Sequence, residues 1–156
     1  MRFYMKQRVF SWTDRFCIYH ESGEVAYTAE GEAFSFGKKL HLLDEQNREQ
    51  AYIEQKIFSF YPRFFIYRSG EQVAEAVQRF SLFRPSYFVE GLGWNIQSDY
   101  FAHEFEIENG ATPIVRVYKD WFSWGDAYAI EVDPYVDESL ALAVVLAIDA
   151  MIENRD

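Results

Sequence analysis

The sequence predicts a mainly β fold, in which a closed antiparallel barrel of twelve strands encloses a hydrophobic C-terminal helix. The first reason is a repeated phrase, Phe-Ser followed by an aromatic residue, which starts at Phe10, Phe34 and Phe58 and so recurs every 24 residues. A fixed period of this length indicates a repeated supersecondary unit. The second reason is the alternation of apolar and polar residues after each copy. The third is a nearly uninterrupted apolar segment near the end of the chain.

Each repeat predicts a short strand, a polar turn and a longer strand. After Phe58, for example, Phe64 and Ile66 recur with the period of two that is typical of a strand, and the segment RSGE follows as a turn. Strands joined by such short turns must be antiparallel. The phenylalanine and tryptophan of each phrase are expected to pack beside the corner. The expected strands cover residues 2–10, 15–20, 24–34, 39–44, 50–60, 63–68, 72–82, 86–90, 92–98, 102–108, 112–121 and 126–133.

Residues 137–154 predict a central helix. Asp137 is a favourable N-cap residue, and only Asp149 is polar between Leu140 and Ile152. A helix that is apolar nearly all round is expected to be buried on every side. The apolar segment falls short of the roughly 20 residues that cross a bilayer, so no transmembrane segment is expected. A barrel of more than about eight strands is too wide for its own side chains to fill, and this helix would fill it.

Composition limits the classes of partner. The 156 residues predict a single domain, 1–156, and the net charge of −10 argues against nucleic acid as a partner. Residues 1–70 hold ten Lys and Arg against nine Asp and Glu, whereas residues 71–156 hold five against sixteen, so an anion site is expected in the first half. Cys17 is the only cysteine, and no signal peptide is recognisable, which favours a cytoplasmic location.

Basic residues recur at one position of the repeat and form the candidate ligand-binding site. The residue five positions after the phrase's phenylalanine is Arg15, Lys39 or Arg63 in the first three copies. Together with Lys38, these residues could line one end of the barrel and bind phosphate or carboxylate groups. The alternative is that each charged residue opens a strand and faces water. The same position holds Pro85 and Ala127 in the two later copies.

Other polar residues carry weaker functional signals. The alternating Glu104, Glu106 and Glu108 could bind a hard cation, although such a row is more often a solvated strand face. The histidines lack the spacing of a zinc site, and Cys17 is expected to be a packed or half-buried thiol. No nucleotide-binding, nucleophile-elbow or metalloprotease motif is present, so we expect no catalytic residue, metal or cofactor. Turn or packing roles are expected for Asp14, Asp126, Trp12, Trp121 and Trp124.

Four stretches together resemble the LURP-one-related family. They are FSWTDRFCIY, GEAFSFGKKLHLLD, WGDAYAIEV and the apolar C-terminal helix. That family shares the Tubby C-terminal-like fold with tubby proteins and phospholipid scramblases. The resemblance implies a closed twelve-stranded barrel around a central helix. Tubby domains bind phosphoinositides through a basic patch, and scramblases act on phospholipids.

The expected function is therefore that of an intracellular, non-enzymatic binding or scaffold domain. Its expected partner is a phosphoinositide or another anionic lipid headgroup, or a protein. An enzyme acting on a small molecule at the barrel rim is the alternative, and a structural protein without a ligand is a third. The sequence leaves the oligomeric state open.

Overall fold

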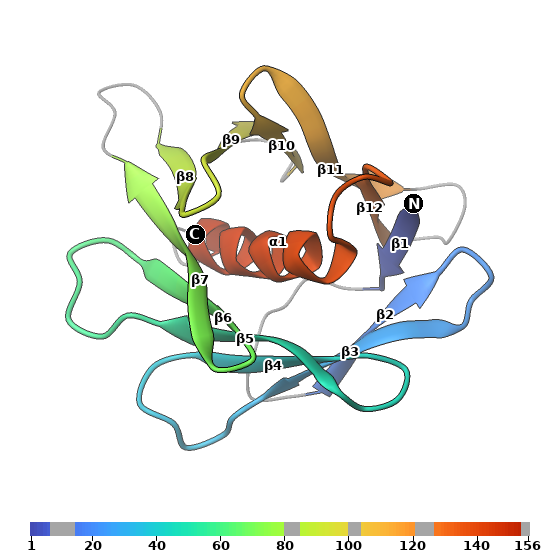
Figure 1. Ribbon diagram of the computed structural model, residues 1–156, viewed down its shortest axis with the longest axis horizontal. Coiled ribbons are helices and arrows are strands. Elements are labelled where there is room, and N and C mark those ends of the chain that lie inside the picture. Colours follow the sequence, from blue (N-terminus) through green and yellow to red (C-terminus); the bar gives the residue numbers. More distant parts are fainter. Residues whose placement is uncertain (7–14, 80–84, 100–103, 121–126, 154–156) are drawn as a thin grey trace.

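The computed structural model describes residues 1–6, 15–79, 85–99, 104–120 and 127–153. Within them the chain forms twelve strands and one helix, α1 (Glu138–Glu153) (Figure 1). The strands are β1 (Arg2–Met5), β2 (Arg15–His20), β3 (Val25–Gly31), β4 (Lys39–Leu43), β5 (Glu49–Gln55), β6 (Arg63–Arg68), β7 (Glu71–Arg79), β8 (Ser86–Glu90), β9 (Trp94–Asp99), β10 (Glu104–Asn109), β11 (Thr112–Asp120) and β12 (Ala127–Val132).

The strands form one closed antiparallel barrel. Each strand pairs with the next along the chain, and β1 pairs with both β2 and β12, which closes the ring. In Figure 1 the strands surround the helix. The predicted mainly β barrel with a C-terminal helix is therefore confirmed. Because the strands alternate in direction, every even-numbered strand begins at the same end of the barrel.

The 24-residue repeat is visible in the backbone. Strands β2, β4 and β6 begin at residues 15, 39 and 63. The pairing of each with the following strand shifts in register at the same point, opposite residues 18 and 19, 42 and 43, and 66 and 67, where β3, β5 and β7 each carry one extra residue. Such bulges bend a strand and increase its twist, which helps a sheet to close. The repeated sequence thus corresponds to a repeated, equally bent hairpin.

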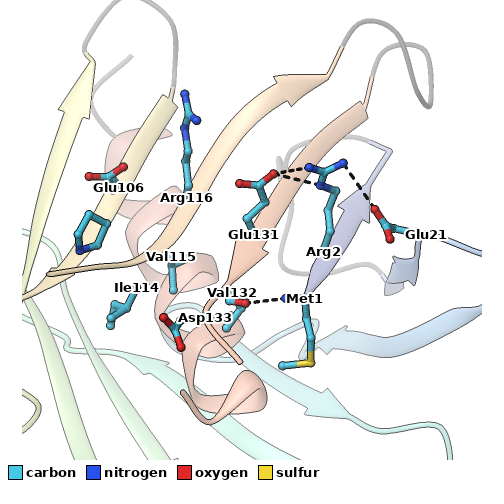
Figure 2. A pocket seen from close by; sticks show the side chains of 11 residues that line it. Met1, Arg2, Glu21, Glu106, Ile114, Val115, Arg116, Glu131, Val132 and Asp133 are labelled. Carbon is cyan, nitrogen blue, oxygen red and sulfur yellow. Dashed lines mark hydrogen bonds and ion pairs between the residues drawn. The ribbon is translucent and has the colours of Figure 1, made fainter. Parts of the chain in front are cut away.

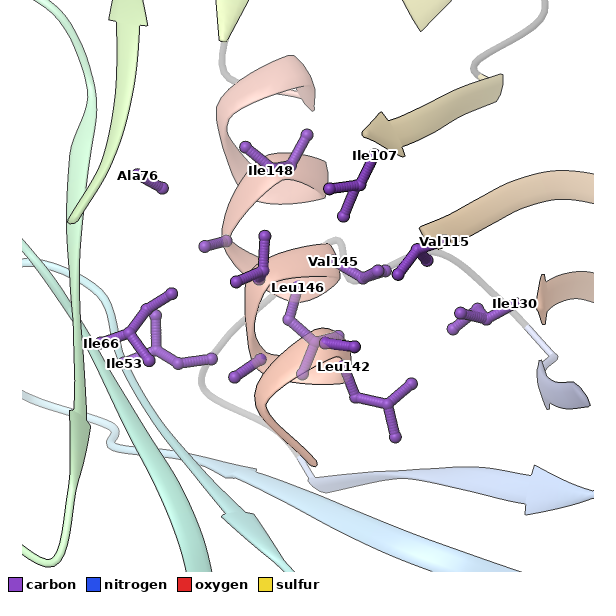
Figure 3. Packing of buried hydrophobic residues seen from close by; sticks show 14 of the residues in the cluster. Ile53, Ile66, Ala76, Ile107, Val115, Ile130, Leu142, Val145, Leu146 and Ile148 are labelled. Carbon is purple, nitrogen blue, oxygen red and sulfur yellow. The ribbon is translucent and has the colours of Figure 1, made fainter. Parts of the chain in front are cut away.

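The core lies between the helix and the inward faces of the strands. The helix residues from Ala141 to Ile148 are fully buried. Figure 3 shows side chains of the strands meeting those of the helix, as the uninterrupted apolar segment predicts. The contributing residues labelled there are Ile53, Ile66, Ala76, Ile107, Val115, Ile130, Leu142, Val145, Leu146 and Ile148.

Hydrogen bonds tie the start of the helix to the barrel. Asp137 caps it, as predicted, since its Oδ1 accepts the N–H of Leu140 at 3.0 Å, and its Oδ2 lies 2.6 Å from Arg68 at the end of β6. Burial alone would raise the pKa of Asp137, but these bonds outweigh it and lower the pKa. The hydroxyl of Tyr27 in β3 donates to Glu138 at 2.6 Å. The helix therefore begins at the opposite end of the barrel from the starts of β2, β4 and β6.

Three strands end earlier than predicted. The expected strand 2–10 stops at Met5, and Lys6 lies in a bend. The expected strands 24–34 and 50–60 stop at Gly31 and Gln55, and the phrase's phenylalanines follow in loops. Phe34 and Phe58 have φ angles of 61° and 59°, which an extended strand cannot contain. Both side chains are exposed, so the expectation that they pack beside the corner is wrong for these two copies. The copies at Phe10, Phe80 and Phe122 extend into segments outside the described residues.

Candidate functional site

Two neighbouring loops carry a group of exposed apolar side chains. Residues 32–38 connect β3 to β4, residues 56–62 connect β5 to β6, and both loops lie at the end where the even-numbered strands begin. We call the group the aromatic loop surface; it consists of Phe34, Phe36, Ile57, Phe58, Phe60 and Tyr61. The four phenylalanines are between 73% and 108% exposed. Large apolar side chains gathered in this way mark sites of interaction.

Local hydrogen bonds hold the first loop in shape. The Ser35 hydroxyl donates to the carbonyl of Gly37 at 2.7 Å, and Gly37 has a φ of 79°, in the left-handed region that favours glycine. The N–H of Gln55 donates to the carbonyl of Lys38 at 2.8 Å, which joins this loop to β5. The short phrase therefore folds into a turn that directs its phenylalanines outward.

The two loops also contact each other. A Cβ atom added to Gly37 would lie 3.5 Å from Cγ1 of Ile57 in the second loop. The N–H of Lys56 donates to the carbonyl of Arg63 at 2.8 Å, which closes the base of that loop. A groove of about 390 Å³ runs between the loops and is lined by Phe36, Gly37 and residues 55–62. Phe36 and residues 57–61 of the aromatic loop surface thus line one groove, and Phe34 lies on the same loop as Phe36.

The charge of these loops is opposite to that of the whole chain. The loops hold Lys38 and Lys56 and one acidic residue, Glu32, and Lys39 and Arg63 follow them at the starts of β4 and β6. Residues 32–39 and 56–63 thus hold four basic residues against one acidic residue, although the chain carries −10. Lys38 and Lys39 are half-buried, and Lys56 is exposed. Exposed phenylalanines and basic side chains therefore occur together at this end of the barrel.

The four predicted site residues lie at one end of the barrel without converging on one point. Arg15, Lys39 and Arg63 begin β2, β4 and β6, so about 10 Å separates each from the next, given the usual spacing of strands. Lys38 immediately precedes Lys39 in the loop. Basic residues this far apart suit binding to an extended anionic surface better than binding to a single small anion. Their role in binding stays a prediction.

Glutamates already contact two of these four residues. Arg15 forms an ion pair with Glu30 at 3.4 Å. The Nε of Arg63 lies 2.9 Å from the Oε1 of Glu75, and the two groups form an ion pair without the geometry of a hydrogen bond. The Nη2 of Arg63 lies 3.9 Å from the Oε1 of Glu90. For the two arginines the interpretation as strand-opening residues therefore has direct support.

Sequence reasoning missed two components of this site. Lys56 precedes the phrase, whereas the predicted basic positions all follow it. The exposed phenylalanines were expected to be buried. A usable signal for both was the stretch KIFSFYPR, in which basic residues flank the aromatic run on each side.

A histidine lies between two carboxylates on the outer face of β4. The Nε2 of His41 is 2.7 Å from Glu32, its Nδ1 contacts Glu49, and its ring lies 4.8 Å from the ring of Tyr52. Burial would lower the pKa of His41, but the hydrogen bonds and charges of the two glutamates outweigh it and raise the pKa above 6.5. Burial raises the pKa of Tyr52 to about 12.

The protein is expected to lose a part of its stability as the pH rises through the elevated pKa of His41. Because this pKa is higher in the folded state, the stabilisation is complete below about pH 6.5 and disappears above the folded value. The difference in unfolding free energy between wild type and His41→Gln should therefore be largest near pH 6 and shrink toward pH 9. We expect this difference in unfolding free energy to be about 1 kcal/mol or less, as for partly exposed ion pairs. Denaturant titrations measure it; a difference that grows with pH would contradict the assignment.

A shallow pocket of about 560 Å³ lies on the outer face of the barrel, over β1, β11 and β12 (Figure 2). The guanidinium of Arg2 donates to Glu131 at 2.6 and 3.1 Å, and the Tyr118 hydroxyl donates to the same carboxylate at 2.8 Å. Although burial opposes it, these bonds lower the pKa of Glu131, and burial raises that of Tyr118 to about 12. Neither group therefore titrates near neutral pH, as a general acid or base would.

Charges of opposite sign alternate across the strands beside this pocket. Arg2, Glu131, Arg116 and Glu106 stand directly opposite one another in turn on β1, β12, β11 and β10. Cross-strand pairs of opposite charge stabilise a sheet. Of the three glutamates predicted to form a strip on β10, Glu106 belongs to this pattern, and all three are half-buried on the outer face of the strand.

The remaining sequence candidates do not form a site among the described residues. His20 lies 3.0 Å from Glu45, and Cys17 is half-buried, as expected. Within residues 1–6, 15–79, 85–99, 104–120 and 127–153, no group of three His, Cys, Asp or Glu could hold a metal ion. Over the same ranges, no helix has both the length and the apolar character needed to cross a membrane. His103, Asp14, Asp126, Trp12, Trp121 and Trp124 lie outside the described residues.

Comparison with known proteins agrees with this architecture. A family model described as LURP-one-related matches residues 1–149. The uncharacterized protein YxjI of Bacillus subtilis (strain 168) is 31% identical over 153 residues, which cover 98% of this chain and 94% of that protein. An X-ray structure of a protein from Arabidopsis thaliana superposes with a TM-score of 0.68 over 96% of this chain and 89% of that one, at 12% identity, and so shares the fold. The chain belongs to the LURP-one-related family.

Proposed function

We propose that the protein is a non-enzymatic domain that binds anionic lipid headgroups, such as those of phosphoinositides, at the barrel end bearing the aromatic loop surface. One observation carries the proposal: residues 32–39 and 56–63 hold four basic residues and one acidic residue, Glu32, in a chain of net charge −10. A positive region on an otherwise acidic protein attracts an anionic surface in one orientation only.

The spacing of the basic residues supports a surface as the ligand. Lys38 and Lys56 lie on two adjacent loops and Lys39 begins β4, whereas Arg15 and Arg63 lie along the same end of the barrel with glutamates beside them. Each Lys or Arg near an anionic membrane contributes about 1 kcal/mol to binding. Glutamates partly neutralise Arg15 and Arg63, and Lys39 stands opposite Glu54 on β5.

The alternatives have less support. An enzyme would need a group that titrates near neutral pH beside a pocket. In the pocket over β1 and β12 the pKa of Glu131 is lowered and that of Tyr118 raised, and His41, whose pKa is raised above 6.5, lines neither that pocket nor the groove between the loops. A protein partner would need to match both the positive charge and the exposed aromatic side chains. Phosphoinositide binding by tubby domains, which share the fold, is consistent with a lipid ligand.

Removing two of the lysine charges is expected to weaken binding to anionic vesicles. The variant Lys38→Gln with Lys56→Gln should bind vesicles that contain phosphatidylinositol 4,5-bisphosphate about 30-fold less tightly, since two contacts of about 1 kcal/mol are lost. Co-sedimentation at low salt measures this. The matched control, Arg48→Gln with Arg116→Gln, removes the same charge elsewhere and should bind as wild type does. Wild-type binding by the lysine variant, or no binding by the wild type, would overturn the proposal.

A further inference from the structure

We infer that the aromatic loop surface inserts into the interfacial layer of an anionic phospholipid bilayer, with Phe36 and Phe60 entering beneath the headgroups. This inference rests on the proposed function and extends it, because it specifies the partner as an intact membrane. A free headgroup or inositol phosphate would satisfy the lysines alone and leave the phenylalanines in water.

The exposure of the phenylalanines is the first argument. Phe34, Phe58 and Phe60 are 108%, 96% and 104% exposed, which places each side chain fully in solvent. Single exposed apolar residues are ordinary, but four exposed phenylalanines on two touching loops concentrate apolar surface at one end of the barrel. Amphipathic surfaces of this kind bury aromatic side chains a few ångströms into the boundary between headgroups and acyl chains.

The backbone holds this exposed arrangement in place. Phe34 and Phe58 adopt left-handed φ angles of 61° and 59° at equivalent points of the repeat. Non-glycine residues with this conformation are uncommon, and such strain concentrates at binding sites. The hydrogen bonds of Ser35 and Gln55 keep the first loop folded without a ligand. The loops are therefore preorganised, which lowers the entropic cost of insertion.

The charge around the aromatic loop surface selects an anionic bilayer over a second copy of the chain. Lys38 and Lys56 flank the phenylalanines, where they can contact phosphate groups while the rings pass below them. Two copies that met through these loops would bring like charges together. A bilayer with anionic headgroups instead matches the apolar surface and the positive charge at once.

Replacing the inserted rings is expected to remove the salt-resistant part of membrane binding. Wild type should still bind vesicles of phosphatidylcholine and phosphatidylinositol 4,5-bisphosphate at high salt, where electrostatic attraction is screened. Phe36→Ser with Phe60→Ser should bind at least about tenfold less tightly there, and circular dichroism should show an unchanged fold. The matched control is Tyr135→Ser, which removes an aromatic ring that is 99% exposed at the far end of the barrel and should bind as wild type does.

A second readout reports insertion directly. Brominated acyl chains should quench the additional fluorescence of Phe60→Trp but not that of Tyr135→Trp. Wild-type binding by Phe36→Ser with Phe60→Ser, together with unquenched fluorescence of Phe60→Trp, would overturn insertion while leaving the lysine test, and so the proposed function, intact. Equal affinity for soluble inositol phosphates and for vesicles would also overturn it. The inference would also be overturned if removal of the rings abolished self-association of the protein and left membrane binding unchanged.

Discussion

A chain that ends at Val136 is expected not to fold. The helix contributes six large apolar side chains with no solvent exposure: Leu142, Val144, Val145, Leu146, Ile148 and Met151. Burying each contributes about 1.5–3 kcal/mol, so their sum on the order of 10 kcal/mol matches the whole stability of a typical domain, about 5–15 kcal/mol. The strands facing them would line an empty interior. Circular dichroism and thermal unfolding should show no cooperative transition.

A point variant makes the same test less drastic. Leu146→Ala is expected to reduce the unfolding free energy by about 2–5 kcal/mol, because it leaves a cavity in the centre of the core. The control Leu140→Ala changes a partly buried residue at the first turn of the same helix and should cost less. A truncated chain that unfolds cooperatively as a monomer would contradict the helix-filled barrel.

Gly91→Ala is expected to destabilise the protein by about 3 kcal/mol or more. Gly91 follows β8 with a φ of 90°, and an added Cβ would lie 2.6 Å from the carbonyl oxygen of Val73. Contact with rigid backbone at that distance requires β7 and β8 to separate. For a protein of about 150 residues this corresponds to a fall in the melting temperature of about 10 °C.

Gly93 in the same turn supplies the matched control. It has a φ of 70°, yet an added Cβ would meet no atom within 4 Å. Gly93→Ala should therefore lower the free energy of unfolding by only about 1–2 kcal/mol, which is the cost of a left-handed backbone conformation for a residue with a side chain. Equal melting temperatures for the two variants would contradict the close approach of Gly91 to β7.

The repeat and the helix could be predicted because each depends on local sequence. The 24-residue period of the phrase reappears in the starts of β2, β4 and β6 and in the register shifts between these strands and β3, β5 and β7. The helix was evident because a segment that is apolar all round has no stable place except a core. That the whole chain forms one domain, 1–156, stays a prediction.

The site was harder to predict because it depends on backbone angles and on register. An aromatic residue at the end of an alternating pattern is ordinarily buried, and no local signal marks Phe34 and Phe58 as residues with positive φ angles. The ion pairs of Arg15 with Glu30 and Arg63 with Glu75 depend on which residues stand opposite across the strands. The period therefore predicts where basic residues recur, but not which of them already contact glutamates.

The two ends of the barrel differ in a way that suits binding at one of them. Two described turns at the far end, residues 44–48 and 69–70, are polar, whereas residues 33–39 and 56–63 carry the exposed phenylalanines and the lysines. Binding residues commonly lie on loops that a rigid scaffold holds in position. Here the scaffold is the closed barrel with its buried helix.

Amide hydrogen exchange with and without anionic vesicles tests the central claim most directly. Membrane binding through the aromatic loop surface predicts slower exchange at residues 33–39 and 56–63. It predicts no change at residues 44–48 and 69–70, at the opposite end of the barrel. Protection confined to the far turns or to the pocket over β1 and β12, with unchanged exchange in the two phenylalanine loops, would contradict it.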